Sequence, residues 1–149
     1  MRFVTALTLA LCLLLAACGG SEGPEDKIRA QIAALAEAAE DGKIGPFGDA
    51  IADDYADLRG NDRRQALMTV RGVMLRAGGG LAVFPDVREV TLITDDLAEA
   101  RVRTRFADAD LDRFALQTAV YTFLVTFERD GGDWLIVSAR WAPGDDEPR

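Results

Sequence analysis

Between residues 24 and 77, hydrophobic side chains recur every three or four positions, which is the spacing of one face of a helix. Pro24 suits the first position of a helix, and Gly42 interrupts the first repeat. Asn61 or Asp62 can cap the last repeat, which a run of glycines ends. The pattern predicts helices over residues 24–41, 46–54 and 62–77.

The second half of the chain changes to the two-residue alternation that is typical of β-strands. Gly131-Gly132 favours a tight turn of two residues, since glycine accepts the positive φ that such turns need. An acidic loop is expected over residues 107–113. The pattern predicts strands over residues 81–84, 87–94, 98–107, 116–129 and 133–142. Three helices followed by an antiparallel sheet indicate an α+β domain.

The last two predicted strands contain a phenylalanine, a charged turn with glycines, a tryptophan and an apolar strand: Thr126-Phe127-Glu128-Arg129-Asp130-Gly131-Gly132-Asp133-Trp134-Leu135-Ile136-Val137-Ser138. With the order of the elements, this ending resembles the nuclear transport factor 2-like (NTF2-like) superfamily, which includes SnoaL-like and ketosteroid-isomerase-like proteins. The resemblance extends over about residues 25–142. It implies a strongly curved sheet wrapped around three helices, forming a cone with an open pocket. Because members range from enzymes to binding modules, it implies a fold more than a function.

The start of the chain has the layout of a secretory signal. Arg2 precedes an apolar run over residues 3–15, and small residues then lead into a cysteine at Leu15-Ala16-Ala17-Cys18. The run is shorter than the roughly 20 apolar residues of a spanning helix. The motif resembles the lipobox of a bacterial lipoprotein. That resemblance implies cleavage before Cys18, a diacylglycerol on its sulfur and an acylated amine.

These signals divide the chain into a signal peptide (1–17), a lipidated tether (18–23), an NTF2-like domain (24–142) and an acidic tail (143–149). We expect attachment to a membrane of the cell envelope through the lipid on Cys18. In a Gram-negative cell this would be the outer membrane, facing the periplasm, because Gly19 and not aspartate follows the cysteine.

The composition narrows the chemistry. The formal net charge of −8 argues against nucleic acid as a partner, because binding to phosphates needs a basic face. There is no histidine, and both cysteines are accounted for if Cys12 leaves with the signal and Cys18 is acylated. Thiol catalysis is then excluded, and the commonest general base and metal ligand is missing. We predict no metal site and no cofactor.

The faces of the sheet follow from the predicted turn. Two turn residues place Phe127 opposite Ile136 and Phe123 opposite Arg140. The face with more aromatic residues is assigned to the inside of the cone: Tyr121, Phe123, Val125, Phe127, Trp134, Ile136, Ser138 and Arg140. A register change of one residue would exchange the two faces.

This assignment suggests four ligand-binding candidates: Tyr55, Tyr121, Ser138 and Arg140. Arg140 would hold an anionic group of a ligand in a bidentate clamp. The alternatives are an ion pair with Asp53, Asp54 or Glu128, or a side chain that reaches water at the rim.

Asp54 and Tyr55 follow the second predicted helix, and in resembling enzymes a carboxylate and a tyrosine in the cone transfer protons or polarise a carbonyl. The alternative is that the carboxylates end a helix and face water, while Tyr55 packs without a catalytic role. Outside the cone, apolar residues suggest a covered surface: Val120, Leu124, Leu135, Val137 and Trp141. A second copy of the chain, another envelope protein or the C-terminal tail would cover it.

Three functions therefore stay open. The first is a non-enzymatic, lipid-anchored module that binds a small apolar ligand or a protein partner. The second is a small-molecule isomerase or hydrolase that uses Asp54 and Tyr55. The third is a scaffold that dimerises through its sheet.

Overall fold

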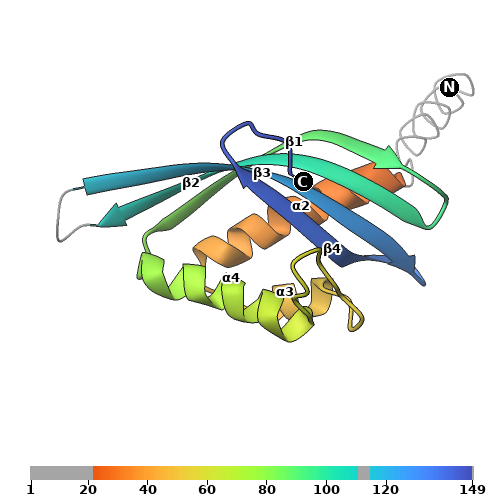
Figure 1. Ribbon diagram of the computed structural model, residues 1–149, viewed down its shortest axis with the longest axis horizontal. Helices are drawn as coiled ribbons and strands as arrows, with labels where there is room; N and C mark the ends of the chain where they lie inside the picture. The colour runs from red at the N-terminus through yellow and green to blue at the C-terminus, as the bar shows by residue number, and fades with distance from the viewer. Residues whose placement is uncertain (1–21, 111–114, 149) are drawn as a thin grey trace, which may run out of the picture.

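The computed structural model describes residues 22–110 and 115–148 (Figure 1), so Cys18 and the predicted signal peptide lie outside the described residues. Helices α2 (Pro24–Glu40), α3 (Gly45–Ala50) and α4 (Arg63–Ala77) precede strands β1 (Leu81–Leu92), β2 (Leu97–Asp110), β3 (Ala115–Asp130) and β4 (Asp133–Pro143). The strands form one antiparallel sheet in the order β1-β2-β3-β4. The predicted α+β class is confirmed. No helix in the described ranges is both long and apolar enough to span a membrane.

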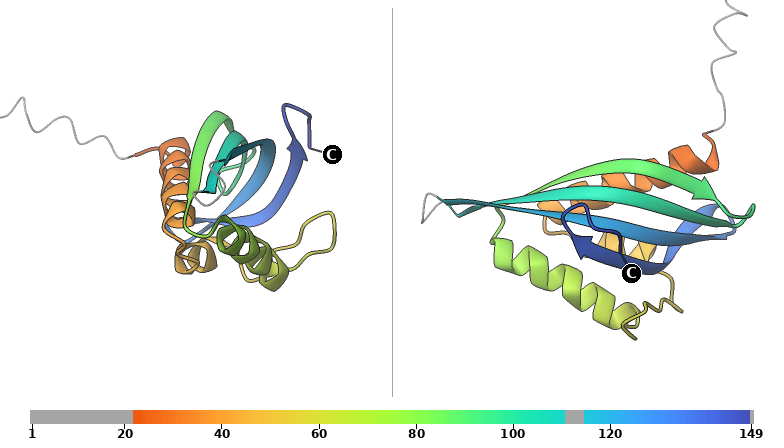
Figure 2. Two further views of the ribbon diagram at one scale, coloured as in Figure 1. Left: turned by 90° about the vertical axis from the view of Figure 1, so that its left-hand side faces the viewer. Right: turned by 45° about the horizontal axis from the view of Figure 1, so that its top comes forward.

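The sheet curls around the helices, as the end-on view in Figure 2 shows. Helix α2 packs against β1 and β2, where Arg29 Nη1 donates a 2.8 Å hydrogen bond to the carbonyl of Val87. The core on this side is a single cluster of buried residues: Ile28, Val90, Ala98, Ala100, Val102, Phe127 and Trp134. Within this cluster Ile28 of α2, Ala98 and Ala100 of β2, and Phe127 of β3 are fully buried.

The first two predicted strands are one strand. β1 continues through Pro85, which lies opposite Thr104. Proline lacks a backbone N–H and is tolerated on an edge strand, where one side of the backbone has no neighbour. The predicted acidic loop is also too long, because β2 runs to Asp110 and β3 begins at Ala115.

The second predicted helix ends early. Helix α3 stops at Ala50, and the chain then runs beside the outer edge of β4. The amide of Ala52 donates to the carbonyl of Ile136 at 3.0 Å, and the amide of Ala56 donates to that of Val137 at 3.1 Å. Carbonyls of an edge strand need donors, and this segment supplies them instead of extending the helix.

Helix α4 is fixed firmly at its first turn. Asp62 caps it, and the Asp62 side chain and Gln65 exchange reciprocal hydrogen bonds in a capping box. Arg63 donates to the carbonyls of Gly48 at 2.6 Å and of Ile51 at 3.0 Å, which ties α4 to α3. Gly78 ends the helix with a φ of 58°, a left-handed conformation that glycine accepts without strain.

The register between β3 and β4 differs from the prediction after four pairs. The turn has the expected length, and Phe127 lies opposite Ile136. A bulge then follows: Thr126 pairs with Ser138, and Val137 has no partner across the ladder. Beyond the bulge Phe123 lies opposite Trp141, not opposite Arg140.

The bulge corrects the predicted faces of β4. Ser138 and Arg140 lie on the outer face of the sheet, whereas Ala139 and Trp141 lie on the inner face. Trp141 therefore does not belong to the predicted outer surface. Val120 and Leu124 do, since they lie opposite the outward-pointing Arg105 and Arg101.

Candidate functional site

A cavity of about 520 Å³ lies between α4 and the concave face of the sheet. One wall is the inner face of α4, which contributes Ala66, Val70, Val73 and Met74. The opposite wall is the sheet, which contributes Phe106, Tyr121, Phe123, Val125, Ile136 and Trp141. The volume lies within the range of typical small-molecule sites, and the lining is predominantly apolar.

The aromatic residues of the sheet wall form a continuous series. The ring centroids of Phe106 and Tyr121 are 6.1 Å apart, and those of Phe106 and Phe123 are 6.3 Å apart, in edge-to-face arrangements. The ring of Trp141 continues the series, with its centroid 6.4 Å from that of Phe123. The bulge at Val137 is what brings Trp141 to this face.

Polar groups of the cavity gather on the segment after α3. Asp57 is buried, and its Oδ1 accepts hydrogen bonds of 2.9 Å from the backbone amides of Arg59 and Asn61. Its Oδ2 accepts a 2.8 Å bond from Asn61 Nδ2. Desolvation acts to raise the pKa of Asp57, but the hydrogen bonds from Asn61 and Arg59 and the charge of Arg59 hold it below the usual value.

Tyr55 is buried in the same wall. Desolvation and, after it, the nearby charge of Asp57 raise the pKa of its phenol, while a hydrogen bond with the backbone of Ala139 acts in the opposite direction. Tyr55 is therefore a neutral phenol at physiological pH. Its partner is on β4, so Tyr55 also helps to cover the edge of the sheet.

Of the four predicted ligand-binding residues, the structure brings two together. Tyr55 and Tyr121 both line the cavity. Ser138 and Arg140 do not, because the bulge turns them to the outer face. There, Arg140 Nη2 lies 3.7 Å from Glu99 Oε2, so its neighbour is none of the carboxylates expected from the sequence.

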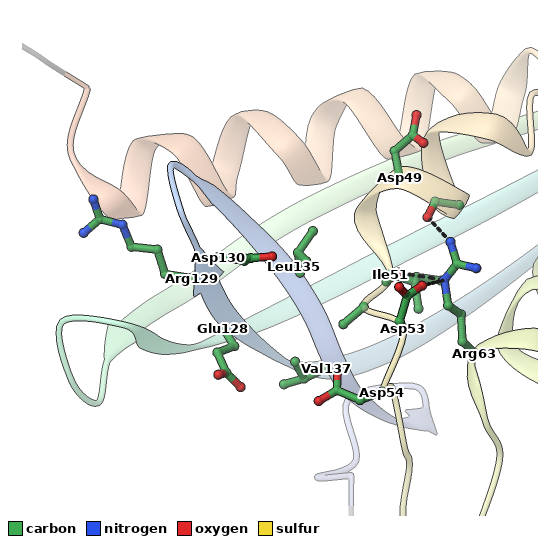
Figure 3. Close-up of a pocket in the computed structure, with 12 residues that line it drawn as sticks. Asp49, Ile51, Asp53, Asp54, Arg63, Glu128, Arg129, Asp130, Leu135 and Val137 are labelled. Atoms are coloured by element: carbon green, nitrogen blue, oxygen red, sulfur yellow. Dashed lines mark hydrogen bonds and ion pairs between the residues drawn. The ribbon is translucent and has the colours of Figure 1, made fainter.

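Asp54 and Tyr55 do not share a site. Tyr55 lines the apolar cavity, whereas Asp53 and Asp54 are exposed and line a separate depression of about 510 Å³. Figure 3 shows this depression, where the Arg63 side chain reaches toward Asp53 and the backbone near Ile51. The side chain of Asp53 is 100 % exposed and lies 3.5 Å from Arg63, which is a geometry of little energetic consequence.

In the ranges that the structure describes, no group of histidine, cysteine, aspartate and glutamate is arranged to hold a metal ion. Asp57, Phe106 and Trp141 also line the cavity, although none of them is among the candidates predicted from the sequence. Phe106 could have been found, because it continues the inward alternation of Val102 and Thr104 on β2. Trp141 could not, because its position depends on the bulge.

No protein-family model matches the sequence, and no curated protein matches it either. Solved structures do. An NTF2-like protein with a cystatin-like fold from Novosphingobium aromaticivorans has a TM-score of 0.69 at 22 % identity, covering 96 % of this chain and 91 % of its own. The hexachlorocyclohexane dehydrochlorinase LinA-type3 from Novosphingobium barchaimii has a TM-score of 0.67 at 12 % identity, covering 84 % and 89 %.

A ketosteroid isomerase-like protein from Erwinia carotovora atroseptica is similar over 80 % of this chain and 95 % of its own, with a TM-score of 0.59 and 16 % identity. At such identities the likeness concerns the fold alone. This chain has the NTF2-like, cystatin-like α+β fold, with its cavity between α4 and the curved sheet.

Proposed function

We propose that this chain is a lipid-anchored protein of the cell envelope whose NTF2-like domain binds a small apolar ligand without catalysing a reaction. The observation that carries the proposal is the cavity, where aliphatic residues of α4 face a series of aromatic rings on the sheet. Burying an apolar ligand there gains about 25 cal/mol per Å² of apolar surface removed from water.

The polar groups of the cavity support binding over catalysis. A general acid or base must exchange a proton with a substrate. Both carboxylate oxygens of Asp57 already accept hydrogen bonds from the protein, and burial favours the neutral phenol of Tyr55. These groups suit a fixed hydrogen bond to one polar end of a ligand better than proton transfer.

The lipid anchor in this proposal rests on the Leu15-Ala16-Ala17-Cys18 motif. Only residues 19–23 separate Cys18 from the start of α2 at Pro24. Such a segment spans at most roughly 20 Å when extended. An acylated Cys18 would thus hold the cavity close to the bilayer, where apolar molecules concentrate.

The test is titration of the protein with Nile red, an apolar dye whose fluorescence rises in apolar surroundings. We expect saturable binding at one site, together with a change in tryptophan emission from Trp141. Val70→Phe, which fills the cavity, weakens binding at least tenfold. Met68→Phe is the matched control, because Met68 is exposed on the same helix, and it leaves binding unchanged.

Absence of saturable binding, or equal affinity in the Val70→Phe variant, would contradict the proposal. The alternative function is an isomerase or hydrolase of the SnoaL-like type that uses Asp54 and Tyr55. The exposure of Asp54 outside the cavity speaks against it. Turnover of a small molecule that Asp54→Asn abolishes in a folded protein would establish that alternative.

A further inference from the structure

The segment that follows β4 turns back onto the outer face of the sheet. The amide of Gly144 donates a 2.8 Å hydrogen bond to the carbonyl of Val120, and Thr122 Oγ1 donates one of 2.8 Å to the carbonyl of Gly144. Gly144 has a φ of 66°, which allows the reversal. Figure 2 (right) shows the end of the chain lying across this face.

The charges of the tail match those beneath it. Arg101, Arg103 and Arg105 alternate along the outer face of β2 and form a row, called here the arginine row. Arg103 pairs with Asp145, and Arg101 pairs with Glu147. The two arginines are two residues apart in sequence, and so are the two carboxylates. The tail runs antiparallel to β2, so an extended acidic segment can place one carboxylate beside each arginine.

Two side chains of the outer face near the tail have little exposure to solvent. Leu124 and Thr122 are only 9 % and 7 % exposed, although both lie on the outer face. Pro148, near the end of the chain, is buried as well. The contact therefore combines two ion pairs with the hydrogen bond from Thr122 on the outer face to the carbonyl of Gly144.

The third arginine extends beyond the acidic part of the tail. The guanidinium carbon of Arg105 lies 5.3 Å from the ring centroid of Phe84, and both side chains are exposed. Pro143, two residues before Asp145, belongs to β4 and pairs with Tyr121, so the alternating carboxylates of the tail begin at Asp145. A separate peptide that continues the alternation by one more carboxylate would reach Arg105, which pairs with neither Asp145 nor Glu147 among the described contacts.

We propose that the arginine row binds an extended acidic segment of a partner protein, with carboxylates at every second residue, and that the tail competes for this site within the same chain. The partner is thus a polypeptide of stated chemistry, with Asp145 and Glu147 showing its spacing. Release of the tail frees the guanidinium groups of Arg101 and Arg103, so the partner binds only where the tail has left.

The test uses the full chain and a fluorescent peptide with the sequence of residues 142–149, followed by anisotropy. In the variant Asp145→Asn/Glu147→Gln, the chain's own tail no longer competes, and we expect the peptide to bind at least fivefold more tightly than to the unaltered protein. A peptide carrying Pro143→Glu binds more tightly still, because it adds a carboxylate for Arg105. Added salt weakens both.

Adding Arg103→Gln to the same variant lowers the affinity for the peptide. The matched control is Arg64→Gln on the exposed side of α4, which leaves the affinity unchanged. Equal binding to the variant and the unaltered protein would overturn the proposal, and so would an affinity that Arg103→Gln leaves unchanged. Self-association of the variant without peptide binding would also overturn it, in favour of a second copy of the chain as the occupant.

Discussion

The guanidinium carbon of Arg59 lies 4.7 Å from the centre of the Trp141 ring. This contact joins the far end of β4 to the segment that contains Asp57, and both Asp57 and Trp141 line the cavity. On the sheet, Trp141 is in turn neighboured by Phe123, with 6.4 Å between the ring centroids. The cavity wall is thus continuous from the loop to the middle of the sheet.

Removing the cation should loosen this wall. Arg59→Ala is expected to lower the free energy of unfolding by about 0.5–1 kcal/mol, the usual contribution of an exposed cation–π contact. Hydrogen exchange of the amides at residues 57–61 should accelerate more than that of the β-strands. Arg64→Ala, at an exposed position of α4, serves as the control. An unfolding free energy equal to that of the unaltered protein would show that the contact is not stabilising.

Ionisation of Asp57 should make the free energy of unfolding depend on pH in the acidic range. Its pKa in the folded protein is lowered, so the ionised carboxylate stabilises the fold above the usual aspartate value of 3.8, and this contribution is lost as the pH falls through the folded pKa. Asp57→Asn should therefore be less stable than the unaltered protein near pH 7, by about 1–3 kcal/mol. Denaturant unfolding from pH 7 down to pH 3 should show the two proteins converging. A constant difference over that range would contradict the assignment.

Tyr55 should resist ionisation. Its pKa in the folded protein is raised above 10.0, so the neutral phenol contributes stability below that value, and the contribution is lost as the pH rises through the folded pKa. Absorbance titration of the phenolate should show a late transition that Tyr55→Phe removes. If Tyr55→Phe leaves the late transition in place, the buried phenol is another residue.

Phe127 should be the most costly aromatic side chain to truncate. It is fully buried in the cluster beneath α2, so Phe127→Ala is expected to destabilise the fold by about 3–5 kcal/mol. Phe84→Ala, at a position that is 49 % exposed, should cost far less. Thermal unfolding of both variants measures the difference in stability. Similar losses of stability in the two variants would show that Phe127 is not a central residue of the core.

Cys18→Ser tests the proposed acylation. The variant should retain the length of the precursor, take up no labelled palmitate, and lose the processed form in membrane fractions, because the sulfur is the proposed point of attachment. Incorporation of label that the substitution does not affect would exclude Cys18 as that point.

Much of the fold could be predicted from local patterns. Helical spacing located α2 and α4, and the glycine pair at 131–132 located the β3–β4 turn, because these signals act over a few residues. The early end of α3 was missed, since the following segment is held by Ile136 and Val137, far along the chain.

The site was predicted less well for a related reason. Tyr55 and Tyr121 were placed in the cavity, but Ser138 and Arg140 were exchanged with Ala139 and Trp141. Extrapolating a register from a turn assumes that no residue is inserted, and nothing near Val137 in the sequence signals an insertion. Asp57 was passed over because its role depends on folding of the loop around it.

The bulge at Val137 divides β4 into two halves with opposite phase. If Val137 paired across the ladder, every later residue of β4 would shift by one position, turning the Arg140 cation into the cavity and the Trp141 indole ring toward the arginine row. No single substitution could do both. One unpaired residue on an edge strand thus decides whether the end of this cavity is aromatic or cationic, although that residue lies before the part of the strand that it orients.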